Sequence, residues 1–487
     1  MRLIFFYIIF SVLPLLSVAQ PLQSFVEGKQ TLPVLQGALW GGVAAYTDTP
    51  QQPLFSVNAN TRLTPASTLK LLTTAAALEI FGPEHRFETR LYAQTLPDEN
   101  GILRGNLYLR AGADPTLGST RVTGGQTWQQ VVEQWVKAIQ KAGIKQVTGA
   151  VIADVSLFEG PSVAPKVNWE NMGNYYAAPV SPLCFNDNLF EIHFKPQLRA
   201  DQPTEIAGTT PEVAGLQLQN FVTTDGKSKK DNAYVYAAPQ QYNLKIFGTI
   251  PTNLNGFTIK AALPDSALFA AQMLQNALTQ QNISVAQAAQ TTSQAPDYTT
   301  QQLLHTYYSP RLKDIVVIVN KRSFNLYADM LLRGLALHEG KKGSLDNGLQ
   351  ALQQFLQKKH IASPTDTVIY DGSGLSRDNL LTPQTLLNTL AYMAKSPYFD
   401  IYYHSLATPN DRGDLLVLRR FLKPFKKVEQ VRVKGGTIDG VKAAAGYASD
   451  KEGRLIAFVL IANNLASKDE SLLRMHEGII KQLLQLP

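Results

Sequence analysis

Ser67 and Lys70 are the residues of this chain whose types and spacing most directly suggest chemistry. They stand three positions apart, and the mostly apolar run at 69–78 predicts a buried helix. Because residues i and i+3 share a helix face, the lysine amine can reach the serine hydroxyl. A serine needs a nearby base to become a nucleophile, and apolar surroundings favour the neutral amine that can act as one. The pair therefore predicts an activated serine.

Two further segments give this pair a context. The sequence Ser-Phe-Asn at 323–325 comes just before a predicted helix, and Val-Lys-Gly-Gly-Thr at 433–437 ends a predicted strand. A single Ser-x-x-Lys is expected by chance in a chain of 487 residues. Ser-x-x-Lys followed by Ser-x-Asn and Lys-x-Gly, in that order, is typical of penicillin-binding proteins and class A β-lactamases.

The resemblance to one family extends beyond these three motifs. The chain resembles the serine-type D-alanyl-D-alanine carboxypeptidases and endopeptidases, the class C low-molecular-mass penicillin-binding proteins of peptidase family S13. The resemblance runs from about residue 30 to about residue 480. The segments that carry it are PASTLKLLTTAAAL, AGADPTL, the run from YYAAPVSPL to NDN, SPRLKDIVVIVNKRSFNLYADMLLRGL, YDGSGLSRDN and KGGTIDGVKAAAGYA.

The resemblance implies a role for each motif residue. Ser67 would be the nucleophile, Lys70 its general base, and Ser323 a proton relay to the leaving group. The substrate-binding residues would be Asn325, Lys434, Gly436 and Thr437. Backbone N–H groups of Ser67 and Thr437 would form an oxyanion hole. No cofactor and no metal are expected, and the seven histidines form no metal-binding motif.

Two positions depart from the family pattern. Gly435 stands where threonine is usual, and Phe324 replaces a common aspartate. Neither change removes a group with an expected role, so we expect an effect on rate or β-lactam affinity rather than loss of activity.

Three other features can be interpreted either as ordinary structural features or as parts of a functional site. Residues 371–377, DGSGLSR, read as a Gly/Ser turn, and in the family they border the active site. Asp154 is either a contact for a substrate amine or a solvated loop carboxylate. The basic cluster at 418–434 is either a solvated face or a surface that attracts anionic wall polymer.

The distance in sequence between the motifs predicts the architecture. Ser67 and Ser323 must meet although about 250 residues separate them, so we expect one catalytic domain built from both chain ends. The resemblance implies an α/β (α+β) transpeptidase-like domain with a central antiparallel sheet and two mostly β insertions. The expected divisions are a signal peptide at 1–19, a catalytic domain at 20–90 and 290–487, domain II at 91–96 and 169–289, and domain III at 97–168.

The N-terminal segment and the composition indicate the cellular location of the protein. Arg2, an apolar run at 3–16 and small residues before Gln20 predict an export signal cleaved after Ala19, and hence the periplasm or cell envelope. The net charge of +7 is too small and too dispersed to indicate nucleic acid. Cys184 is the only cysteine, so no intramolecular disulfide can form, and we interpret it as a buried apolar residue.

The sequence thus predicts a serine D-Ala-D-Ala carboxypeptidase, a D,D-endopeptidase, or both, acting on peptidoglycan stem peptides and blocked covalently by β-lactams. The ratio of the two activities and the oligomeric state are left open. The alternative is a wall-binding scaffold of the same fold with weak turnover. A class A β-lactamase is disfavoured, because Glu170 and Asn174, which imitate its Glu-x-x-x-Asn element, precede Ser323 rather than follow it.

Overall fold

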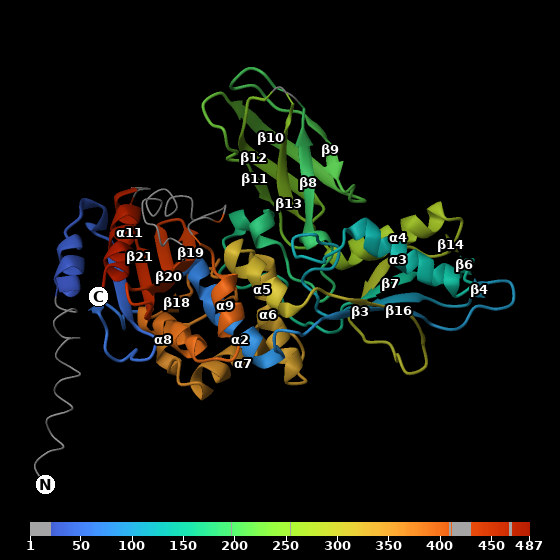
Figure 1. Cartoon of the computed structure of the whole chain (residues 1–487). Helices are drawn as coiled ribbons and strands as arrows, with labels where there is room; N and C mark the ends of the chain where they lie inside the picture. Colours follow the sequence, from blue (N-terminus) through green and yellow to red (C-terminus); the bar gives the residue numbers. More distant parts are fainter. Residues whose placement is uncertain (1–20, 196, 254, 409–410, 412–429, 467–469) are drawn as a thin grey trace, which may run out of the picture. The chain divides into compact units, whose positions relative to one another are not determined.

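The computed structural model describes residues 21–195, 197–253, 255–408, 411, 430–466 and 470–487 (Figure 1). The chain divides into two compact units. The terminal unit contains Met1–Pro83, Val316–Phe324 and Leu349–Pro487, and the middle unit contains Glu84–Ile315 and Asn325–Gly348. The predicted signal peptide lies outside the described residues.

A five-stranded sheet forms the centre of the terminal unit. Its strand order is β19-β20-β21-β1-β2, and every neighbouring pair is antiparallel. Its strands are β1 (Leu39–Tyr46), β2 (Phe55–Val57), β19 (Val431–Ile438), β20 (Val441–Ser449) and β21 (Leu455–Asn463). The central antiparallel sheet predicted from the sequence is therefore confirmed.

Helices cover both faces of this sheet, which explains why its central strands are so apolar. All but the first residue of β21 are buried, as expected of a strand with no face in water. Trp40 and Phe458 belong to the apolar cluster formed with α11 (Glu470–Leu484). On the opposite face a Cβ at Gly41 would lie 3.2 Å from Pro383 at the start of α8 (Pro383–Ala394), so the glycine permits close packing.

The remaining elements of the terminal unit are short or helical. Residues 21–29 are helical and pack into the same apolar cluster as α11. The others are η1 (Pro33–Leu35), η2 (Ala66–Leu69), α2 (Lys70–Phe81), η6 (Pro364–Asp366), β17 (Thr367–Val368), β18 (Leu380–Leu381) and α9 (Phe399–Ser405). The helix predicted over 69–78 is confirmed, and its residues 70–78 are all buried.

The described residues of the middle unit form four sheets. The five-stranded sheet has the order β15-β7-β5-β3-β16, and the three-stranded sheets have the orders β10-β12-β11, β13-β8-β9 and β14-β6-β4. The strands are β3 (Glu88–Ala93), β4 (Ile102–Leu103), β5 (Leu107–Arg110), β6 (Gln146–Val147), β7 (Val151–Asp154), β8 (Leu189–Phe194), β9 (Ile206–Thr210), β10 (Gln217–Asp225), β11 (Tyr234–Tyr236), β12 (Asn243–Pro251), β13 (Phe257–Ala262), β14 (Ser284–Val285), β15 (Gln290–Thr292) and β16 (Gln302–Tyr308).

Helices α3 (Trp128–Lys141) and α4 (Ser266–Gln280) close the core of the middle unit. Trp135 of α3 is fully buried and stacks on Phe185 at a centroid distance of 5.7 Å. Thr127 caps α3 in a reciprocal capping box, which fixes the start of the helix. The unit also contains η3 (Trp169–Asn171), η4 (Tyr175–Ala177), η5 (Asn186–Asn188) and α6 (Asn325–His338).

Helices α5 (Leu312–Lys321) and α7 (Leu345–Lys358) contain two of the four positions at which the chain passes between the units, and the other two are 83/84 and 324/325. Residues 279–302, which are rich in Gln, Thr and Ala, contribute β14 and β15, which pair with β6 and β7. Backbone pairing thus gives order to a Gln-rich segment with few apolar side chains. The domain boundaries derived from the resemblance stay a prediction.

No helix among the described residues is long and apolar enough to span a bilayer. The basic cluster at 418–434 falls largely on residues 412–429, outside the described part of the chain.

Candidate active site

Ser67 and Lys70 meet at the junction between η2 and α2. Ser67 lies in the 3₁₀ turn, and Lys70 is the first residue of the α-helix. Side chains at i and i+3 eclipse in a 3₁₀ turn. Lys70 Nζ donates to Ser67 Oγ at 3.0 Å, and Lys70 is completely buried. The junction of two helix types therefore holds an amine directly against a hydroxyl.

Close backbone approaches fix the turn that carries Ser67. Ala66 takes a φ of 47°, which is uncommon for a residue with a side chain. A Cβ at Gly374 would lie 1.9 Å from Ala66 O, and a Cβ at Gly436 would lie 3.0 Å from Ser67 N. Only glycine fits at these two positions without moving the serine. Gly436 thus acts here by bringing β19 against η2.

A second partner of the lysine comes from the loop at 371–379. Lys70 Nζ donates to Ser373 O at 2.5 Å. This loop is organised around Asp371, which is 1% exposed and accepts hydrogen bonds from the backbone N–H groups of Gly374 and Ser376, both at 2.6 Å. The Asn379 side chain donates to the same carboxylate at 2.9 Å.

Burial raises the pKa of Asp371, while its N–H donors and the charge of Lys70 act in the opposite direction. The sequence predicted that residues 371–377 border the site but gave Asp371 no role of its own. An Asp-Gly-Ser-Gly turn is a common loop sequence, and only the burial of the carboxylate sets this residue apart.

Ser323 and Lys434 form the second contact among the predicted residues. Lys434 Nζ donates to Ser323 Oγ at 2.9 Å and to Gly435 O at 2.8 Å. Lys434 is 2% exposed, and Ser323 takes a φ of 55°. Such a conformation costs about 1–3 kcal/mol in a non-glycine residue and is enriched at functional sites.

The elements that carry the two pairs are adjacent in the terminal unit. Strand β19, with Lys434, lies against η2, as the contact at Gly436 shows. Asn320, three residues before Ser323, donates to Thr74 Oγ1 of α2 at 3.3 Å and to Ser405 Oγ at 2.8 Å. Segments from three distant parts of the sequence therefore converge on the start of α2.

The remaining predicted residues lie in different surroundings. Thr437 is exposed, and its Oγ1 accepts a hydrogen bond from Lys442 Nζ at 3.1 Å. Asn325 opens α6 in the middle unit, where its side chain donates to Tyr176 O at 2.7 Å. Phe324, in place of the common aspartate, is 8% exposed and adds no polar group.

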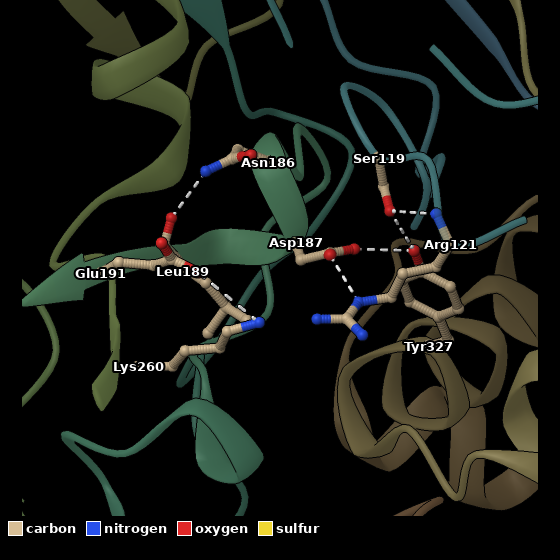
Figure 2. Close-up of polar contacts among 8 residues, drawn as sticks. All are labelled: Ser119, Arg121, Asn186, Asp187, Leu189, Glu191, Lys260 and Tyr327. Atoms are coloured by element: carbon tan, nitrogen blue, oxygen red, sulfur yellow. Dashed lines mark hydrogen bonds and ion pairs between the residues drawn. The ribbon is translucent and has the colours of Figure 1, made fainter. Parts of the chain in front are cut away.

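A polar cluster anchors α6, the helix that Asn325 opens (Figure 2). The hydroxyl of the fully buried Tyr327 donates to Asp187 at 2.7 Å, and Arg121 Nε donates to the other oxygen of that carboxylate at 2.6 Å. Ser119 Oγ lies 3.0 Å from the same tyrosine hydroxyl. These bonds fix the first turn of α6 within the middle unit.

Asp154 is buried at the end of β7, so its interpretation as a solvated loop carboxylate is wrong. Its exposed fraction is 3%, and it accepts hydrogen bonds from Ser156 N at 2.8 Å and from Tyr298 Oη at 2.6 Å. Burial, together with this hydrogen bond, raises the pKa of Tyr298. Cys184 is buried, as predicted.

The antiparallel sheet and the serine–lysine junction are typical of one class, the serine hydrolases that include the penicillin-binding proteins and the class A β-lactamases. Solved structures agree on the fold. The chain matches penicillin binding protein 4 (dacB) from Haemophilus influenzae with a TM-score of 0.79 at 24% identity, covering 96% of this chain and 99% of the other. The same protein "complexed with novel beta-lactam" matches with a TM-score of 0.75 at 23% identity, with the same coverage.

Sequence comparison identifies the family. The profile of the D-Ala-D-Ala carboxypeptidase 3 (S13) family matches residues 22–482. A D-alanyl-D-alanine carboxypeptidase from Actinomadura sp. (strain R39) is 26% identical over 460 residues, covering 91% of this chain and 82% of the relative. The carboxypeptidase DacB of Haemophilus influenzae is 26% identical over 430 residues, covering 88% and 86%. The chain belongs to the S13 family and is a serine peptidase, as the motifs predicted.

Proposed function

We propose that this protein hydrolyses bonds that follow D-alanine in peptidoglycan stem peptides, through an acyl-enzyme on Ser67. Such an enzyme removes the terminal D-alanine, cuts D,D-crosslinks, or does both. The observation that carries the proposal is the 3.0 Å contact between Lys70 Nζ and Ser67 Oγ, made by a fully buried lysine. The relatives named D-alanyl-D-alanine carboxypeptidases support this substrate class.

In the proposed reaction, Lys70 takes the proton from Ser67 Oγ as that oxygen attacks the carbonyl carbon of the penultimate D-alanine. A C–O bond forms and, as the tetrahedral intermediate collapses, the C–N bond breaks. Ser323 passes a proton to the leaving amine, so the departing group is neutralised. Water then attacks the ester and releases the shortened peptide, restoring the Ser67 hydroxyl.

Binding groups for this reaction come from the third motif. We assign Lys434 to the terminal carboxylate of the substrate, with the Thr437 hydroxyl beside it, because a nearly buried ammonium attracts a carboxylate strongly. Backbone N–H groups of Ser67 and Thr437 form the oxyanion hole, a kind of site in which one donor contributes about 3–4 kcal/mol where it has been measured. Asn325 holds the substrate backbone.

We propose that β-lactams acylate Ser67 as they imitate the acyl donor; a related structure contains a β-lactam. We also propose that the enzyme is exported to the cell envelope, as residues 1–19 suggest. The three-domain division given above belongs to the same proposal.

A labelling experiment tests the proposal. The purified protein should be labelled covalently by a fluorescent penicillin and should release D-alanine or uncrosslinked muropeptides, seen by mass spectrometry. Both should be lost in Ser67→Ala and kept in Ser56→Ala, a control at an exposed serine of the same unit. Labelling without product release would favour the scaffold alternative, and labelling of Ser67→Ala would contradict the proposal.

A further inference from the structure

One face of the sheet β10-β12-β11 carries a row of aromatic side chains in water. The pairing register places Phe221 opposite Phe247 and Phe247 opposite Tyr234, so the three side chains lie on one face. Their exposed fractions are 54%, 42% and 37%. The opposite face is the core face, formed by Val222, Val235, Leu244, Ile246 and Ile250.

Ring contacts extend this row toward η3. Phe221 stacks on Phe247 at 4.7 Å, and Tyr236 meets Phe247 edge-on at 5.6 Å. Trp169 lies 4.8 Å from Tyr236 and is 67% exposed. We call Phe221, Phe247, Tyr234, Tyr236 and Trp169 the aromatic face. Large apolar rings gathered in water mark an interaction surface, because a monomer gains nothing by exposing them together.

The polar neighbours of the rings narrow the chemistry of the partner. Along these strands the same face also presents Gln217, Gln219, Thr223, Asp225, Asn243, Lys245 and Thr249. Lys245 and Asp225 carry opposite charges. The other five are amides or hydroxyls, which donate and accept hydrogen bonds without charge. Gln219 and Asn243 already bond to each other at 3.0 Å and hold their amides in place.

This charge pattern disfavours polyanions. Nucleic acids and anionic lipid surfaces are bound by several cations. The strand positions on this face offer one cation, Lys245, and one carboxylate, Asp225. A neutral partner rich in hydroxyl and amide groups fits better. The C–H faces of pyranose rings carry partial positive charge and are attracted to the negative faces of aromatic rings. N-acetylated polysaccharide combines both features.

We propose that the aromatic face binds the glycan strand of peptidoglycan. This inference rests on the proposed function, since that substrate carries its stem peptides on a polysaccharide. A chain held through its sugars raises the local concentration of its peptides around the enzyme, without any change at Ser67. The aromatic face then favours polymeric wall over free peptide as substrate.

The test uses a probe that contains no peptide. The Ser67→Ala protein, which cannot digest the wall, is titrated calorimetrically with a β-1,4-linked N-acetylglucosamine hexamer and with peptide-free glycan strands. We expect saturable binding, weakened about tenfold in Trp169→Ala and in Phe247→Ala, the scale of an aromatic hot-spot truncation. Tyr308→Ala is the matched control, because Tyr308 is 55% exposed on a different strand, β16, and should leave binding unchanged.

Two further measurements separate the possible outcomes. Turnover of a soluble D-Ala-D-Ala peptide by the Trp169→Ala enzyme should equal that of the unmodified enzyme. If neither enzyme turns the peptide over, the proposed function is refuted, while the binding of glycan is judged separately by the titration. The inference is overturned if the hexamer and the strands do not bind, or if both aromatic-face variants bind them normally. It is also overturned if these variants change the sedimentation of the protein, since a second copy would then be the occupant.

Discussion

Lys434 Nζ donates a hydrogen bond to Ser323 Oγ at 2.9 Å, across 111 positions of sequence. The contact joins the second and third motifs, and Lys434 is almost completely buried while Ser323 is partly buried. We expect Lys434→Ala to lower kcat/KM for a D-Ala-D-Ala peptide by about 10²–10³-fold. The substrate carboxylate that we assign to Lys434 would lose its ammonium partner, and truncating one partner of a buried hydrogen-bonded charge pair costs about 2–5 kcal/mol. Lys434→Arg should restore little, since a guanidinium fork differs in shape from an ammonium. Lys451→Ala, at an exposed lysine of the same unit, is the control, and equal losses in both variants would contradict a specific role.

Replacing Lys70 by a neutral side chain of similar length should separate chemistry from folding. We expect Lys70→Met to keep the cooperative unfolding transition and to slow acylation by fluorescent penicillin by about 10²–10⁴-fold, the contribution of a general base. Stopped-flow labelling measures the rate, and circular dichroism checks the fold. A folded variant that acylates at the normal rate would show that another group accepts the proton.

Asp371 should act as a positioning residue through the carbonyl of Ser373. In Asp371→Asn the amide presents an N–H₂ group toward donors that need an acceptor, so we expect a loss of about 2–3 kcal/mol in unfolding free energy. Because Lys70 would then lose its fixed partner, the pH profile of acylation should shift as well as the rate. Asp378→Asn, in the same loop, is the control. A variant with lowered stability and an unchanged pH profile would mean that Asp371 only holds the loop.

Alanine substitutions at Gly374 and Gly453 separate the effect of backbone strain from that of a steric clash. Both have a positive φ, 81° and 85°, so alanine strains either backbone by about 1–2 kcal/mol. Only at Gly374 would the new Cβ collide, 1.9 Å from Ala66 O, whereas nothing lies within 4 Å at Gly453. We expect penicillin labelling to be lost in Gly374→Ala and retained in Gly453→Ala. Similar labelling of the two variants would show that the turn at Ala66 adapts.

His476 should make stability depend on pH. Burial lowers its pKa to about 3, and its Nε2 accepts a hydrogen bond from Trp40 Nε1 at 3.0 Å. Between pH 6.5 and 3 the unfolded chain binds this proton and the folded chain does not, so stability falls as pH falls, by about 1.4 kcal/mol per pH unit.

Urea unfolding at several pH values tests this expectation against His476→Gln, whose amide oxygen can still accept from Trp40 but does not titrate. The difference in slope between the two proteins isolates the histidine from the other titrating groups. Parallel slopes would show that His476 takes up its proton in the folded state.

Local patterns in the sequence predicted most elements near the site. The apolar run at 69–78 forms α2, and the strand predicted to end at 433–437 is β19. These patterns predict structure because a helix or strand that is buried on one face, or on all sides, has apolar residues at a characteristic spacing in the sequence. Asp371 and Asp154 were harder to interpret, since a carboxylate in a turn has the same local sequence whether it lies in water or under other chain segments.

The sequence by itself determined which functional groups are present: a serine three residues before a lysine, a second serine before a helix, and a lysine on a strand. It also determined the family, through a pattern that extends across the chain. The tertiary structure alone decided which of these groups touch. Helical spacing brings Lys70 to Ser67, but the bond from Lys434 to Ser323 and the closeness of Gly374 to Ala66 depend on packing between remote segments. The number of residues between two segments does not reveal whether they pack together. Their contact depends on how apolar faces elsewhere in the unit are buried.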